Sequence, residues 1–139
     1  MKLVKFFLVG VLLAAFTFFG TMVIEILLYV LAYSFQFLVP LVEGITKPDP
    51  TNPWTYFIML PAIALSIFFS RKTIEANSLK EAIIEGFGWA VIQFSLLIAM
   101  YTMNNGFIGA LERPEYQLIS IGIFIGPLLN YVFKKASKL

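Results

Sequence analysis

The chain has 139 residues, of which 60% are apolar and 17% aromatic, and only 13% carry a charge. A soluble domain carries about 25% charged residues, so this composition excludes an ordinary soluble fold and indicates a membrane protein. The net charge of +2 is small and the bases lie beside apolar segments, which excludes a nucleic-acid partner. Cysteine and histidine are both absent, so we expect no disulfide, no cofactor and no metal site.

The first apolar stretch, at 3–42, decides the topology. It contains one acid, Glu25, and one base, Lys5. A helix needs ~20 apolar residues to cross the ~30 Å hydrocarbon layer, so the stretch exceeds one span but is short for two. A hairpin would turn at 18–25, where Gly20 is the only residue that favours a turn. Turn chemistry therefore favours a single crossing.

Three further apolar segments follow a proline-rich polar break at 43–53. We predict membrane spans at about 54–70, 84–103 and 117–133. Ser78 and Glu81 have the spacing of a capping box, which predicts a helix that begins near Leu79.

The distribution of the ten bases supports a single crossing of the first stretch. With four spans, only Lys47 and Arg113 face one side, and all the other bases face the opposite side. Those other bases are Lys2, Lys5, Arg71, Lys72, Lys80, Lys134, Lys135 and Lys138. A hairpin would move Lys2 and Lys5 across and weaken the asymmetry, so the positive-inside rule favours four spans.

We therefore predict an all-α, polytopic integral membrane protein with a single domain over 1–139 and four transmembrane helices. The first helix, at about 4–32, is expected to be long and either tilted or broken, with an interfacial segment at 33–42 and Pro40 limiting further helix. Both termini are expected in the cytoplasm. Abundant lysine and absent cysteine suit a prokaryotic cell membrane.

Three polar residues are candidates for function inside the membrane. By the helix rise, Glu25 lies ~30 Å beyond the inner interface. It is either a proton- or cation-linked carboxylate of a pathway, or an interfacial acid that is hydrated or paired with Arg113 or Lys47. Gln93 lies near mid-membrane, where it binds substrate or hydrogen-bonds a neighbouring helix. Asn130 is expected close to the cytoplasmic surface as a hydrated or interhelical amide.

Small residues spaced four apart predict close helix packing. These pairs are Gly122 and Gly126, Gly86 and Ala90, and Gly10 and Ala14. Pro61 and Pro127 lie inside predicted spans, where each frees the carbonyl one turn back, so we predict a kink at each.

The opening residues VKFFLVG, together with the four-span plan, resemble the GtrA-like family of small membrane proteins. That resemblance implies a link to the movement of polyprenyl-linked sugars across membranes. It covers about the first ten residues, and Phe68 to Lys72 echoes the family's aromatic and basic pattern only loosely. These residues are too few to assign the family.

Two functions remain open. The first is a non-catalytic accessory or structural subunit of a larger membrane complex, which fits the short loops and the few polar groups within the membrane. The alternative is a small oligomeric transporter, channel or flippase, including one for a lipid-linked substrate, that uses Glu25 and Gln93. Its partners would be lipid and either other membrane subunits or further copies of the chain. Scattered acids and missing histidine and cysteine argue against an enzyme.

Overall fold

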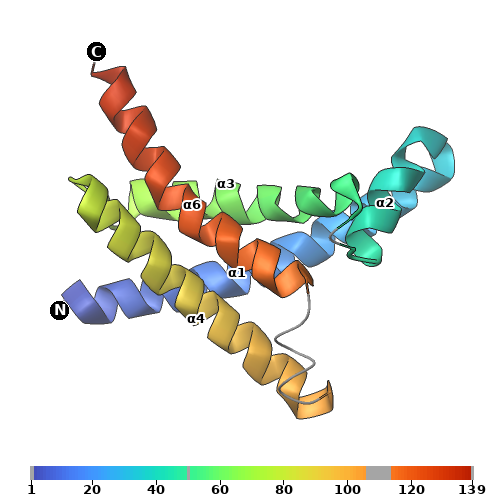
Figure 1. Ribbon diagram of the computed structural model, residues 1–139, viewed down its shortest axis with the longest axis horizontal. Helices are drawn as coiled ribbons and strands as arrows, with labels where there is room; N and C mark the ends of the chain where they lie inside the picture. Colours follow the sequence, from blue (N-terminus) through green and yellow to red (C-terminus); the bar gives the residue numbers. More distant parts are fainter. Residues whose placement is uncertain (1, 50, 106–113, 139) are drawn as a thin grey trace.

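The computed structural model describes residues 2–49, 51–105 and 114–138, which form helices and no strands (Figure 1). Within them, four helical segments are long and apolar enough to cross a membrane. They are Leu3–Ser34, Pro53–Lys72, Leu79–Met100 and Pro114–Ser137. This arrangement confirms the prediction of an all-α protein with four helices of membrane-spanning length, the first of them long.

Helix α1 (Lys2–Ser34) is one unbroken helix of 33 residues. At ~1.5 Å per residue it is ~50 Å long, well beyond the ~30 Å hydrocarbon layer, so it must tilt or project from the membrane. The large apolar side chains along its outer face are exposed, Leu3 and Tyr33 most of all. Exposure of such an apolar face is unfavourable in water but not in lipid. An uninterrupted helix also satisfies the hydrogen bonds of its own backbone groups there.

The chain turns back directly after α1. Phe35 is extended, and a short 3-10 turn (Gln36–Leu38) leads into helix α2 (Val39–Thr46). Pro40 therefore does not limit the helix, as the sequence suggested, but lies in the first turn of α2. Proline is tolerated there because the N–H that it lacks would have no partner within the helix. The second half of α2 occupies the beginning of the predicted polar break.

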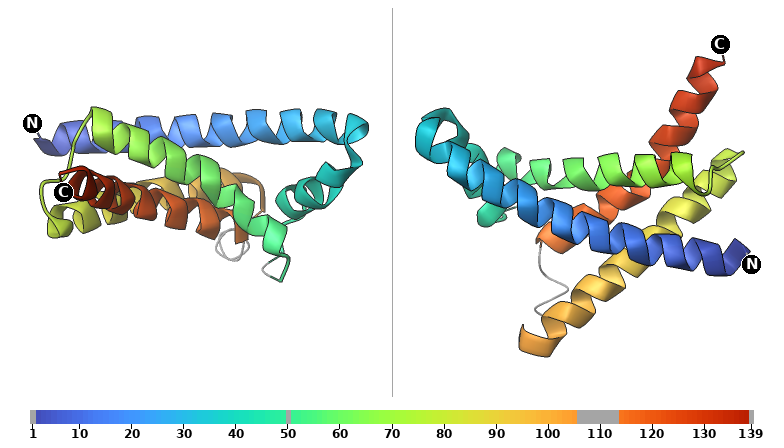
Figure 2. Two further views of the ribbon diagram at one scale, coloured as in Figure 1. Left: turned by 90° about the horizontal axis from the view of Figure 1, so that it is seen from above. Right: turned by 180° about the vertical axis from the view of Figure 1, so that it is seen from behind.

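Helix α2 folds back against the 3-10 segment η2 (Pro53–Ile58), as both views in Figure 2 show. The Thr55 hydroxyl donates a hydrogen bond to the Gly44 carbonyl at 2.8 Å and accepts one from the Asp49 N–H at 3.2 Å. Gly44 permits this approach, because a Cβ there would lie 2.6 Å from the Cβ of Trp54. The loop between α2 and η2 is thus fixed by its own hydrogen bonds.

Helix α3 (Met59–Lys72) continues from η2. Pro61 is its third residue, so the carbonyl one turn back belongs to the 3-10 segment rather than to the interior of an α-helix. Pro127, by contrast, lies inside α6 and is buried there, and the helix continues through it.

Helix α4 (Leu79–Asn105) begins with the predicted cap. The Glu81 N–H donates to the Ser78 hydroxyl at 3.2 Å, and the Glu81 carboxylate accepts from the Asn77 N–H at 2.8 Å. The capping box is therefore confirmed, with the carboxylate reaching one residue further back than Ser78.

Helix α6 (Pro114–Ser137) is the central element, packed extensively against both α3 and α4, while α1 lies across α4 and α3. Gly122 and Gly126 face α3, where a Cβ on Gly126 would overlap the Ser66 side chain. Gly86 of α4 faces the backbone of α6 at Phe124. The GxxxG pair and Gly86 therefore serve crossings within one chain.

The contact between α1 and α4 is built around Trp89, which is fully buried. Its ring stacks on Phe6, with 5.9 Å between ring centroids, and its indole N–H donates to the Phe6 carbonyl at 3.2 Å. Gly10 lies opposite, and a Cβ there would meet Ile92 at 2.6 Å. Ala14, one turn further along α1, is also buried. Ala90, the partner of Gly86 in the sequence pattern, is partly buried.

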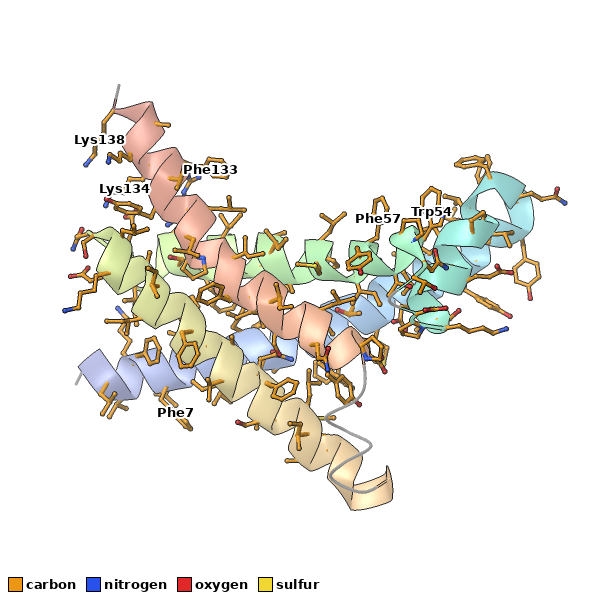
Figure 3. All side chains as sticks on the ribbon, in the orientation of Figure 1. Phe7, Trp54, Phe57, Phe133, Lys134 and Lys138 are labelled. Atoms are coloured by element: carbon orange, nitrogen blue, oxygen red, sulfur yellow. The ribbon has the colours of Figure 1, made fainter. Side chains whose placement is uncertain are left out.

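The N-terminus of α1 and the C-terminus of α6 lie on the same side of the molecule, together with the turn between α3 and α4 (Figures 1 and 2). Lys134 and Lys138 mark this basic end in Figure 3, and Lys134 forms an ion pair with Glu75 of the α3–α4 turn at 3.5 Å. Trp54 and Phe57 lie at the other end of α3. The ends of the helices therefore alternate between two sides, as four spans require.

Candidate functional site

Glu25 of α1 and Gln93 of α4, distant in sequence, line the same pocket. Glu115 and Tyr116, at the start of α6, line it as well, together with Thr21 of α1. The cavity has a volume of about 260 Å³ and lies where α1, α4, α6 and the end of η2 approach one another. The structure thus brings together two of the three polar candidates identified from sequence.

Helical spacing explains how each element contributes. Thr21 and Glu25 are four residues apart on α1, so their side chains share one face of that helix. Gln93 and Leu97 have the same relation on α4, and so do Glu115 and Ile119 on α6. On each of the three helices, two of the side chains that line the cavity therefore lie one turn apart on the same face.

The charges at this pocket are of one sign. Glu25 is partly buried, and the nearby Glu115 carboxylate repels it electrostatically. Among the described residues that line the cavity there is no Lys or Arg. Lys47 is exposed at the end of α2, and among the described residues no ion pair joins it to Glu25. Arg113, the other partner considered from sequence, lies outside the described residues.

Gln93 is the most deeply buried polar group of the pocket. Only 1% of the residue is exposed, and its side-chain oxygen has no hydrogen-bond donor. The Thr21 hydroxyl is also buried without a partner. An unpaired buried polar group costs ~1–3 kcal/mol, so the cavity wall holds two oxygens that a hydrogen-bond donor inside it would stabilise. The hydrogen bond to a neighbouring helix, one of the two roles considered for Gln93, does not engage this oxygen.

The polar groups of the pocket can bind a ligand through its hydrogen-bond donors or its positive charge. The carboxylates and the amide oxygen of the pocket are acceptors, which attract cations and N–H donors. No cluster of three or more histidine, cysteine or acidic residues that would hold a metal occurs within the described part of the chain.

A second polar cluster lies deeper between α3, α4 and α6. Asn130 is 1% exposed, and its amide nitrogen donates to the Ser70 hydroxyl at 3.4 Å. Ser66, one turn before Ser70, donates to the Gly122 carbonyl at 3.4 Å. Asn130 is therefore a buried interhelical amide, one of the two alternatives considered from sequence, and its oxygen has no donor.

Glu85 of α4 belongs to this second cluster and is only 4% exposed. The Ser70 side chain lies next to its carboxyl group, yet neither carboxyl oxygen makes a hydrogen bond of ordinary geometry. The nearby bases Arg71 and Lys72 are exposed, and within the described residues no ion pair joins either of them to Glu85. Glu85 and Glu115 are the two acidic residues of these sites that the sequence analysis did not single out.

A sequence signal for the second cluster does exist. Ser66 and Ser70 are four residues apart on α3, and Gly122, Gly126 and Asn130 follow the same spacing on α6. Two stripes of small and polar residues at helical spacing are expected to face each other. No comparable stripe marks Glu115, the second residue of α6.

Comparison with protein-family models, curated protein sequences and solved structures finds no significant match for this chain. The resemblance of the opening residues to GtrA-like proteins therefore carries no further argument. The function has to be inferred from the pocket itself.

Proposed function

We propose that this chain is a small membrane transporter or channel for a positively charged solute, and that the solute passes through the pocket of Glu25 and Gln93. A single observation carries the proposal. Within the described part of the chain, Glu25 is a partly buried carboxylate without an ion-pair partner and Gln93 has a buried amide oxygen without a donor, and both side chains line one cavity from two different helices. Ionisable groups at such positions in membrane helices are costly and commonly mark a substrate or ion path.

The position of the pocket fits a path rather than a closed interior site. Glu115 is the second residue of α6, whereas Gln93 lies fourteen residues into α4, ~21 Å from its first residue by the helix rise. The cavity therefore extends from the level of a helix end toward the middle of the bundle. Four helices enclose little space, so the remainder of the path would run between copies of the chain.

Transport can be tested directly in proteoliposomes. Radiolabelled rubidium ion or methylammonium would be added outside the proteoliposomes. The uptake of each cation would be compared with its uptake by liposomes that contain no protein. Glu25→Gln removes the charge at almost constant shape, so we expect uptake of the transported cation to fall at least about tenfold, the effect of losing a charged hydrogen bond. Glu43→Gln, which changes an exposed acid of α2, is the matched control. Unchanged uptake in a folded Glu25→Gln protein would refute the proposal.

We also propose that both termini face the cytoplasm of a prokaryotic cell. Supporting this orientation, the bases of the α3–α4 turn and of the end of α6 lie on the same side as the N-terminus (Figure 3). Cytoplasmic loops of membrane proteins carry an excess of lysine and arginine.

The accessory-subunit hypothesis is the second candidate, and a different feature favours it. An apolar groove of about 570 Å³ lies between the beginning of α1 and α4, lined by Phe7, Phe87 and Val91 among others. A transmembrane helix of another protein would fill such a groove by close packing. Purification from native membranes in mild detergent, followed by mass spectrometry, would recover that partner. Recovery of the chain without any companion would exclude this candidate.

A further inference from the structure

We infer that the solute bound in the pocket is a protonated primary amine with a short apolar tail. This inference rests on the proposed function and names the class of the cation. It follows from the arrangement of the acceptors, the apolar part of the cavity wall and the size of the cavity.

The polar groups fit an ammonium head. A primary ammonium carries three N–H donors. The pocket offers three acceptors from two helices: the Glu25 carboxylate and the Thr21 hydroxyl from α1, and the Gln93 amide oxygen from α4. Two of these oxygens, on Thr21 and Gln93, are buried without a donor. A quaternary ammonium has no N–H and would leave both of them unpaired.

The remaining wall of the cavity fits an apolar tail. Besides Glu115, it consists of the side chain of Tyr116 and five apolar side chains, those of Phe18, Met22, Ile58, Leu97 and Ile119. Met22 and Phe18 lie three and seven residues before Glu25 on α1, and Leu97 lies one turn after Gln93 on α4. A ligand with its charge beside Glu25 and Gln93 would therefore place its carbon atoms against these side chains, where their burial is favourable.

A bare metal ion fits less well. Calcium takes 6–8 oxygen ligands in a close shell, and half of this wall is apolar. The cavity volume of about 260 Å³ also far exceeds the ~30 Å³ that one water molecule occupies. A small ion would keep its water shell in such a space. The apolar side chains of the wall would then have no apolar part of a ligand to contact.

The test is a binding measurement on the full-length protein in lipid nanodiscs by isothermal titration calorimetry at pH 7. The probes are n-butylammonium chloride, its uncharged counterpart butan-1-ol, sodium chloride and calcium chloride. The variants are Glu25→Gln, which removes the charge, and Gln93→Met, which removes the amide oxygen at similar volume. Glu43→Gln serves as the control outside the pocket.

We expect butylammonium to bind and butan-1-ol to bind at least about tenfold more weakly, since a charged hydrogen bond is lost. Glu25→Gln should weaken butylammonium binding about 10- to 100-fold and Gln93→Met about 3- to 10-fold. The control should bind as the wild type does. If Gln93→Met fails to fold, Glu25→Asp is the substitute, and it should retain more of the affinity than Glu25→Gln.

The outcomes separate this inference from the proposed function. Binding of sodium or calcium that depends on Glu25, without binding of butylammonium, would overturn the amine while supporting a cation path. Equal binding of butan-1-ol and butylammonium would also overturn it, because the carboxylates would then play no part. Absence of binding by every cation, together with unchanged uptake by Glu25→Gln in proteoliposomes, would refute both.

Discussion

At the scale of single residues, the molecule places several polar side chains where they lack partners. Gln93 and Asn130 each have a buried amide oxygen without a donor, and Glu85 has two such carboxyl oxygens. Buried polar groups are normally hydrogen-bonded, so each exception needs a reason. In the pocket of Glu25 and Gln93, we propose that a bound solute supplies the missing hydrogen-bond donors. In the deeper cluster the acceptors lie among serine hydroxyls, where a neutral side chain would be accommodated most easily.

Substitution of Glu85 tests the deeper cluster. A buried charge without a partner is strongly destabilising, whereas glutamine keeps the shape and adds two N–H donors to a site rich in acceptors. We expect Glu85→Gln to leave the thermal midpoint of unfolding in detergent unchanged or higher. Glu85→Leu should lower this midpoint, because the Ser70 hydroxyl then loses its polar neighbour. Circular dichroism would follow the melting. A marked loss of stability in Glu85→Gln would mean that a cation pairs with this carboxylate.

Asp49, in the loop after α2, has a measurable acid–base signature. Hydrogen bonds from the Thr51 N–H, at 3.0 Å, and from the Thr51 hydroxyl, at 2.8 Å, lower the pKa of the Asp49 carboxyl below its ordinary value of 3.8. A carboxyl whose pKa is lowered by folding stabilises the loop above its unfolded-state pKa, and this contribution is lost as pH falls through the lower, folded-state pKa. We expect Thr51→Val to move the titration midpoint of Asp49 upward in NMR. An unchanged midpoint would show that the hydroxyl contributes nothing.

At the scale of elements, glycines set how closely the helices approach. A Cβ on Gly126 would overlap Ser66 and lie 3.0 Å from the backbone nitrogen of Ile67. At Gly20, by contrast, the nearest side-chain atom would be 3.6 Å away, at Leu65, which is ordinary contact. The two positions therefore provide a matched pair in one protein.

We expect Gly126→Ala to destabilise the protein by about 1–3 kcal/mol, the usual effect of overpacking, because α3 and α6 must move apart. Gly20→Ala should be neutral or slightly stabilising, since alanine favours a helix more than glycine does. Thermal unfolding of both variants in the same detergent provides the comparison. Equal effects at the two positions would contradict the close packing of α3 on α6.

At the scale of the whole molecule, length and local chemistry allowed much of the fold to be predicted. Four helices of spanning length follow from the apolar segments, and the beginning of α4 follows from Ser78 and Glu81. The finding that Glu25 and Gln93 line the same pocket could not be predicted. Both α1 and α4 are apolar all round, so the sequence does not indicate which face of either helix turns inward. That rotation is set by packing around Trp89 and the glycines, which depends on the assembled bundle.

The topology can be tested with single cysteines, because the chain contains none of its own. We expect Lys138→Cys to react with a membrane-impermeant maleimide only after the membrane is opened, and Thr51→Cys to react in intact cells. This expectation follows from their places at opposite ends of the helices and from the positive-inside rule. Reaction of both cysteines in intact cells would contradict the four-span topology.

The central claim is that Glu25 and Gln93 act on one solute in one pocket, and a double-mutant comparison of cation uptake in proteoliposomes tests it most directly. Uptake would be measured for the wild type, Glu25→Gln, Gln93→Met and the protein carrying both changes. Residues that share a site lose function together, whereas distant and independent residues have additive free-energy effects. We expect the double variant to be little worse than Glu25→Gln alone. Fold losses that simply multiply, or uptake unaffected by either change, would contradict the claim.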